Sequence, residues 1–189
     1  MSDSGTDVTL RAADYTLEDE RQALADAFTS FFQKSSPADR VRAAEPLGFD
    51  ADLWRELGGL RAVAMGVAEE AGGDGAGLVE LVLAAEPFGR HLAPVPLVEA
   101  TVAARLLASV APDDDWLPAV LSGERLVTLA LHAARPGTPQ LVPAGAVADG
   151  VVGLVDDALV VATRGDDPPP VANQGHAPIA RWSLGAEGV

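Results

Sequence analysis

The sequence contains no cysteine, and this absence removes several kinds of chemistry at once. Without a thiol, the chain can form no disulfide bond, carries no thiolate nucleophile and offers no cysteine ligand to a metal ion. Three histidines are present, His91, His132 and His176, but no two have the spacing that places metal ligands on one face of a helix. We therefore expect no metal site.

Basic residues are also scarce, since 13 lysines and arginines stand against 28 aspartates and glutamates, for a net charge of −15. Such a chain has few cations with which to neutralise phosphates or anionic lipid headgroups, so neither nucleic acid nor a membrane is an expected partner. Lys34 is the single lysine, and this preference for arginine is typical of a high-GC bacterial genome.

Long apolar runs are missing too, because none approaches the roughly 18 residues that identify a membrane-spanning helix. The first residues are polar and acidic and do not resemble a secretory signal peptide. We expect a cytoplasmic protein in which residues 1–15 form a flexible tail. Apolar residues still make up 48% of the chain of 189 residues, which is enough for a folded core.

Helical spacing of apolar residues dominates from residue 16 to residue 123. Thr16, Ser36 and Asp50 are suitable N-caps, with Pro37 at a first helical position where its missing N–H does no harm. Gly58 suits the left-handed position that follows many helix ends. The predicted helices are 17–34, a short one after Ser36, 51–57, 76–88, 97–110 and 113–121.

Two of these predicted helices, 76–88 and 97–110, are apolar almost all round, which is typical of buried helices. Pro87 lacks an amide hydrogen and should kink or end the first of them. The connector over residues 60–67 is expected to be extended.

The pattern changes to β-type near Glu124. Residues 126–132 form a compact strand-like run, and 148–155 and 158–163 flank an Asp-Asp pair that favours a hairpin turn. We therefore predict an α+β fold, with an all-α domain over 16–123 and a small β domain over 124–189.

The glycine cluster at residues 72–77 invites a nucleotide-binding interpretation. It lacks the Lys-Ser/Thr of a P-loop and the strand–turn–helix context of a dinucleotide fingerprint, so a structural turn is expected. Glu69, Glu70 and Glu86 could act as catalytic carboxylates, although Glu86 and Arg90 are better explained as an i,i+4 ion pair. No Gly-X-Ser-X-Gly elbow is present, which excludes that class of hydrolase site.

The order of these features resembles the N-terminal half of an acyl-CoA dehydrogenase. Residues 53–58 read Leu-Trp-Arg-Glu-Leu-Gly, where the family has Leu-X-X-Leu-Gly. Residues 68–75 read Ala-Glu-Glu-Ala-Gly-Gly-Asp-Gly, where it has Pro-Glu-Glu-X-Gly-Gly-X-Gly. Residues 86–90 read Glu-Pro-Phe-Gly-Arg, near Glu-Glu-Leu-Gly-Arg, and a Pro-X-Pro at 94–96 and Ser-Gly-Glu at 122–124 follow.

The resemblance implies FAD as cofactor and an acyl-CoA thioester as substrate. In the family, a glutamate from a C-terminal helical bundle removes an α-proton while the flavin accepts the β-hydride. No residue of this chain matches that glutamate, because the bundle is absent from the sequence, so no catalytic residue is assigned. The resemblance also implies assembly, either as a homo-oligomer or with a full-length acyl-CoA dehydrogenase subunit.

The family's flavin motif, Thr-Glu-Pro-X-X-Gly-Ser-Asp, is poorly preserved at residues 132–139, which read His-Ala-Ala-Arg-Pro-Gly-Thr-Pro. Gly137 matches, Thr138 replaces serine, and Leu131 could offer its backbone to the ring. These three are the candidate cofactor residues, and tight FAD binding by this chain alone is not expected. Three functions stay open: an acyl-CoA dehydrogenase polypeptide without its C-terminal domain, a non-catalytic partner of a heteromeric acyl-CoA dehydrogenase, and an unrelated helical binding module.

Overall fold

The computed structural model describes residues 16–135, 138–165 and 168–185, so the predicted tail lies outside the described part. Helices precede strands, which confirms the α+β prediction. The helical elements are α1 (Asp19–Ser35), α2 (Ala38–Ala43), α3 (Ala51–Gly59), the short 3₁₀ helix η1 (Glu69–Ala71), α4 (Leu78–Arg90), α5 (Leu97–Val110) and α6 (Leu117–Leu121). The strands are β1 (Val127–Leu129), β2 (Gln140–Val142), β3 (Gly150–Val155), β4 (Ala158–Thr163) and β5 (Ala180–Trp182).

The strands form two small sheets. In the first, β3 lies between β1, which is parallel to it, and β4, which is antiparallel; in the second, β2 and β5 pair antiparallel. The predicted β3–β4 hairpin is confirmed, and its turn residue Asp156 has a positive φ of 51°. Sequence analysis missed β2 and β5, which are three residues each. Strands this short carry no periodic pattern and depend on the partner strand.

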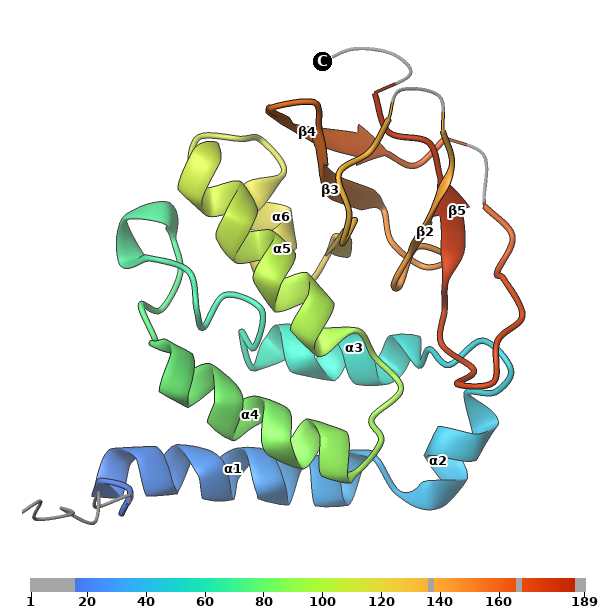
Figure 1. Cartoon of the computed structure of the whole chain (residues 1–189). Coiled ribbons are helices and arrows are strands. Elements are labelled where there is room, and N and C mark those ends of the chain that lie inside the picture. Colours follow the sequence, from blue (N-terminus) through green and yellow to red (C-terminus); the bar gives the residue numbers. More distant parts are fainter. Residues whose placement is uncertain (1–15, 136–137, 166–167, 186–189) are drawn as a thin grey trace, which may run out of the picture.

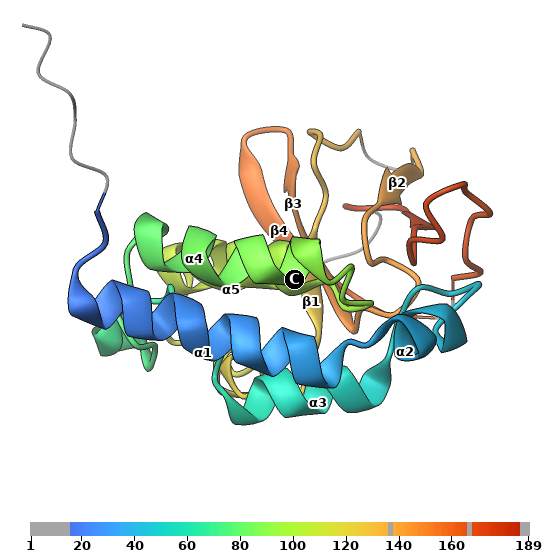
Figure 2. The ribbon, with the colours of Figure 1, turned by 90° about the horizontal axis from the view of Figure 1, so that it is seen from below.

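Helices and strands share one buried core. Figure 1 shows α1 and α4 side by side at the base, with α5 rising from them to pack on β1. The main buried cluster joins Phe32, Leu57 and Leu107 to Val127 and Val152 of the sheet. Figure 2 gives the same arrangement from below, with α1 running along α4. The boundary between two domains at residue 124 stays a prediction.

Two of the three predicted N-caps are wrong. α1 begins after Glu18, not Thr16, and α2 begins after Pro37, whose φ of −67° and ψ of 156° are those of a cap residue and not of a first helical turn. The Ser36 hydroxyl instead donates to the backbone oxygen of His91, 3.3 Å away, and so joins α1 to the end of α4. The predicted N-cap at Asp50 is confirmed, because the Asp50 carboxylate accepts a hydrogen bond from the Leu53 amide at 2.8 Å.

The predicted left-handed end at Gly58 is also wrong. α3 continues through Gly59, and the positive φ of 55° falls on Arg61. Gly58 is required for a different reason: a Cβ there would lie 2.6 Å from the backbone oxygen of Ser122. Residues 60–66 form successive turns, so the predicted extended connector is wrong. Three residues within these turns, Ala62, Val63 and Ala64, are buried.

The glycine cluster is a structural turn, as predicted. Gly72 and Gly75 have positive φ values of 85° and 70°, and a Cβ on Gly73 would lie 2.1 Å from the Val67 oxygen. The Arg61 guanidinium spans the turn, donating to the Gly72 backbone at 2.7 Å and to the Asp74 carboxylate at 3.0 Å. The cluster thus packs on its own chain.

α4 departs most from its predicted form. It runs through Pro87 to Arg90, so of the two predicted effects of Pro87 an end of the helix is wrong, and a kink stays a prediction. The predicted Glu86–Arg90 pair forms at 2.6 Å. Burial of this helix is the larger error, since Leu78 is 71% exposed and Val82 is 56% exposed. An apolar helix sequence indicates that the helix packs against another surface. It does not show that this surface belongs to the same chain.

Candidate functional site

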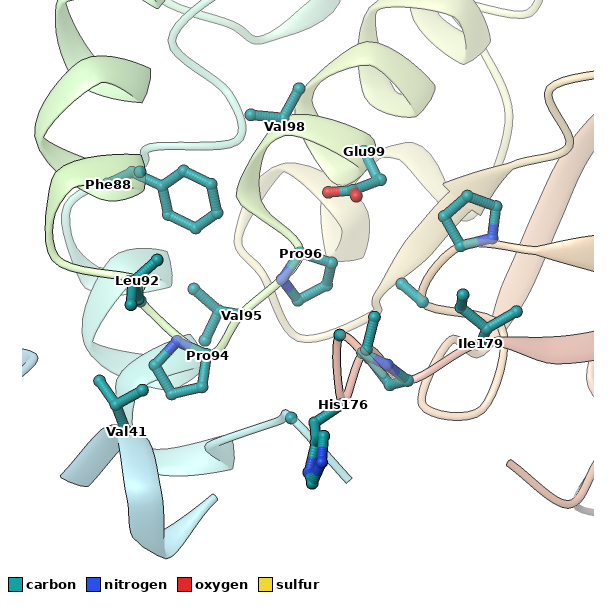
Figure 3. Close-up of a pocket in the computed structure, with 18 of the residues that line it drawn as sticks. Val41, Phe88, Leu92, Pro94, Val95, Pro96, Val98, Glu99, His176 and Ile179 are labelled. Carbon is teal, nitrogen blue, oxygen red and sulfur yellow. The ribbon is translucent and has the colours of Figure 1, made fainter. Parts of the chain in front are cut away.

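A sizeable cavity lies where the end of α4 and the start of α5 face the β2–β5 sheet. We call this cavity of about 690 Å³ the large pocket. Figure 3 shows Phe88, Val95 and Pro96 on one side of it, with Ile179 and His176 on the other. Its size falls within the range of small-molecule sites, and its lining is mostly apolar. This arrangement suits an apolar ligand group.

Two carboxylates reach the large pocket. Glu99, in the first turn of α5, is partly buried among the apolar side chains, and Glu45 lies 3.8 Å from the imidazole of His176. Sequence analysis did not single out Glu99. Its only signal was a charged residue within the otherwise apolar run of 97–110.

A second, narrower hollow lies between α4 and α5. This α4–α5 groove holds about 150 Å³ and is lined by Leu78, Leu81, Val82, Val98, Thr101 and Val102 among others. Val98 also lines the large pocket, so the two hollows meet at the first turn of α5. Around them the protein presents apolar side chains to solvent: Val79 is 46% exposed, and Val98 and Val102 are each 44% exposed.

Ion pairs fix the helices that frame these hollows. Arg21 of α1 donates to Glu80 of α4 at 2.7 Å, and this hydrogen bond lowers the pKa of the Glu80 carboxyl below its ordinary value. Arg40 of α2 makes a two-point contact with Asp50, which lowers the pKa of the Asp50 carboxyl. The Asp50 amide also donates to the backbone oxygen of Pro94, a residue that lines the large pocket.

The candidate flavin residues lie elsewhere, after the end of β1. Leu131 is 62% exposed, and Thr138 is exposed with its amide donating to the Arg135 oxygen at 2.9 Å. Neither lines the large pocket or the α4–α5 groove. Gly137 lies outside the described residues. Between them, Ala134 is buried and bridges to Val155, which continues the path of β1 beside β3.

Neither a metal-ligand cluster nor a membrane-spanning helix occurs in the described ranges, residues 16–135, 138–165 and 168–185. There, no group of three or more His, Asp or Glu side chains comes together to hold a metal ion, and the three histidines lie in separate segments. Over the same ranges, no helix combines the length and the apolar character that crossing a bilayer requires.

Comparisons with known proteins address the whole architecture. The family model described as "Acyl-CoA dehydrogenase, N-terminal domain" matches residues 18–124. Acyl-CoA dehydrogenase IpdE2 of Mycobacterium tuberculosis is 34% identical over 153 residues, which cover 79% of this chain and 46% of the relative. The chain thus spans about half the length of the curated relatives that it matches most fully.

Solved structures agree in fold. The ChsE4–ChsE5 complex from Mycobacterium tuberculosis superposes with a TM-score of 0.75 at 24% identity, covering 91% of this chain and 57% of that one. A variant of the Tcur3481–Tcur3483 steroid ACAD superposes with a TM-score of 0.72 at 28% identity, covering 90% of this chain and 56% of that one. With the matched family model over the helices and the shared fold beyond them, the chain belongs to the acyl-CoA dehydrogenase family.

Proposed function

We propose that this chain supplies the N-terminal helical and β parts of an FAD-dependent acyl-CoA dehydrogenase, and that oxidation of the thioester requires a helical bundle carried by other residues. The large pocket would hold part of the acyl group. Family membership supports the reaction type, and the observation that carries the requirement for a bundle is the exposed apolar face around the α4–α5 groove.

That face is incomplete as the surface of an isolated protein. Four side chains that line this one apolar groove are at least 44% exposed: Leu78 and Val82 of α4, and Val98 and Val102 of α5. Isolated apolar residues on a surface are ordinary, but contiguous patches usually mark an interface. A helix packed along the groove would bury these side chains together.

The acyl group is proposed to be bulky. A pocket of about 690 Å³ with an apolar lining accommodates a ring system or a branched chain. Among the similar structures, Tcur3481–Tcur3483 is named a steroid ACAD, and its 28% identity favours a steroid-type side chain over a simple fatty acid here.

FAD does not fit the residues of this chain by themselves. Leu131 and Thr138 are exposed and line neither hollow. His132 stands at the first hydroxyl position of the family's motif, and Ala133 and Pro139 stand at its two acidic positions. We therefore derive no chemical step through the flavin. We propose instead that another subunit holds the FAD. The exposed segment around Leu131 and Thr138 would then contact an edge of that flavin.

The second candidate is a non-catalytic partner subunit, and the altered flavin motif favours it. ChsE4–ChsE5, which shares the fold, is named as a complex of two different chains. In that case this chain would stabilise an active subunit without holding substrate itself.

One co-expression experiment tests both candidates. The chain is produced with a bundle-bearing acyl-CoA dehydrogenase subunit from a neighbouring gene, and flavin absorbance and acyl-CoA oxidation are measured. We expect a flavin-containing complex that oxidises acyl-CoA. The substitution Ile179→Trp places a large ring in the large pocket, away from the α4–α5 groove, so activity should fall if this chain holds substrate and persist if it is a non-catalytic partner.

A further inference from the structure

One wall of the large pocket is a loop rather than a helix. Residues 171–179, which we call the strap, precede β5 and contribute Gly175, His176 and Ile179 to the lining. The strap lies beyond residues 18–124, which the family model matches. Figure 3 shows its residues His176 and Ile179 facing the helical side of the pocket.

The strap is held in one conformation by Asn173. The side-chain nitrogen Nδ2 of Asn173 donates to the backbone oxygens of Val171 and Ala177 at 2.9 and 2.8 Å, and its side-chain oxygen Oδ1 accepts from the backbone amide of Ala177 at 3.1 Å. The Val171 amide donates to the Ile179 oxygen at 2.7 Å, which closes the base of the loop. These bonds make the strap a preorganised wall.

The tip of the strap rests on Gly48, which lies between α2 and α3. A Cβ at Gly48 would stand 1.8 Å from the backbone oxygen of His176, and Gly48 has a φ of 72°. Both observations require glycine at this position. The 3.8 Å contact between His176 and Glu45 lies nearby, but both side chains are about half exposed, so this pair adds little. The close backbone approach fixes the tip of the strap against Gly48, and both segments line the large pocket.

The other walls are stiff as well. Pro94, Pro96 and Pro143 line these walls, and a proline ring fixes its own backbone φ. A cavity whose walls are held in place favours a ligand whose shape is already fixed. A flexible chain loses more conformational freedom on entering such a cavity.

We propose that the strap, seated on Gly48 and braced by Asn173, makes the large pocket selective for a compact, rigid ring group over an extended chain. Gly48 and Asn173 are then positioning residues that set ligand shape. The inference rests on the proposed function only in assigning the pocket to the acyl group. The strap, Gly48 and Asn173 all belong to this chain, so the test varies residues of this chain and measures ligand binding to it directly.

The test compares two neutral alcohols with the same number of carbon atoms, decahydronaphthol as a rigid ring and n-decanol as a flexible chain. Dissociation constants are measured by NMR titration of the full chain, following the amides of residues 175–177. The native chain should bind the ring alcohol about tenfold more tightly. In Asn173→Ala and Gly48→Ala, n-decanol should bind more tightly and the ring alcohol less tightly, so that the preference disappears.

Gly59→Ala is the matched control, because a Cβ at Gly59 meets nothing within 4 Å. It should keep the native preference. If Asn173→Ala or Gly48→Ala weakened the binding of both alcohols equally, the variant would have damaged the fold in general. That result would contradict a positioning role. The proposal would be overturned if the native chain bound both alcohols equally well or bound neither of them. It would also be overturned if Asn173→Ala and Gly48→Ala kept the native preference for the ring alcohol. The co-expression assay of acyl-CoA oxidation does not depend on the preference between the two alcohols. Failure of the inference about the strap is therefore distinguishable from failure of the proposed function.

Discussion

Arg40 and Asp50 form a two-point ion pair, with guanidinium nitrogens 2.6 and 3.0 Å from the two carboxylate oxygens. The same carboxylate caps α3 through the Leu53 amide, and Arg40 also donates to the Ser35 oxygen at 2.9 Å. One partly buried pair therefore joins the end of α1, the body of α2 and the start of α3.

We predict that Asp50→Ala lowers the free energy of unfolding by about 2 kcal/mol, because it removes both an N-cap and a charged hydrogen-bond acceptor. Asp52→Ala is the control, since the Asp52 side chain is 70% exposed and pairs only with Arg55 three residues away. Its effect should stay within about 0.5 kcal/mol. Urea unfolding followed by circular dichroism measures both, and equal losses would show that Asp50 has no special role.

The Asp50 pair also predicts a pH dependence. Because Arg40 lowers the folded-state pKa of Asp50 below its ordinary value of 3.8, the unfolded chain takes up a proton first as the pH falls. The stabilisation is present above about pH 4 and is lost as the pH falls through the folded-state pKa. Asp50→Asn should therefore flatten the acid limb of the stability curve, and an unchanged limb would contradict this.

Gly58 and Gly59 are adjacent but should respond oppositely to alanine. Gly58→Ala forces a methyl group to within 2.6 Å of the Ser122 oxygen and should cost about 1–3 kcal/mol. Gly59→Ala meets open space near the end of α3 and should leave stability unchanged or raise it by up to about 1 kcal/mol. Thermal unfolding of the two variants, measured side by side, decides the point.

The α4–α5 groove should control association. We predict that Leu78→Ser with Val82→Ser weakens self-association or binding of a bundle-bearing subunit, because both side chains are exposed at the groove. Stability of the isolated chain should change by less than about 0.5 kcal/mol. Val110→Ser, at the far end of α5 and 56% exposed, is the control. Light scattering after size-exclusion chromatography would contradict the prediction if the native chain were a stable monomer at micromolar concentration.

Sequence reasoning succeeded where the signal is local. The Asp50 cap, the bounds of α5 and the β3–β4 hairpin each follow from neighbouring residues. It failed where distant segments decide the outcome. Gly58 is required by Ser122, far along the chain, and the strap is positioned by Gly48, so neither relationship has a local pattern.

The candidate site divides in the same way. The motifs were sufficient to predict the family, because they record the order of elements. The large pocket joins the α4–α5 connector to residues 175–179, and no sequence period links those segments. The exposure of α4 was missed for a related reason: an apolar composition does not say which chain provides the cover.

The most direct test of the account measures acyl-CoA oxidation by the isolated chain, supplied with excess FAD and an artificial electron acceptor, beside the same assay on the co-expressed complex. We predict no oxidation and no stoichiometric flavin for the chain alone, because its candidate flavin residues are exposed and no residue matches the family's α-proton base. The complex should contain flavin and oxidise the thioester. Turnover by the purified chain alone would contradict the claim that this chain forms only part of an active site.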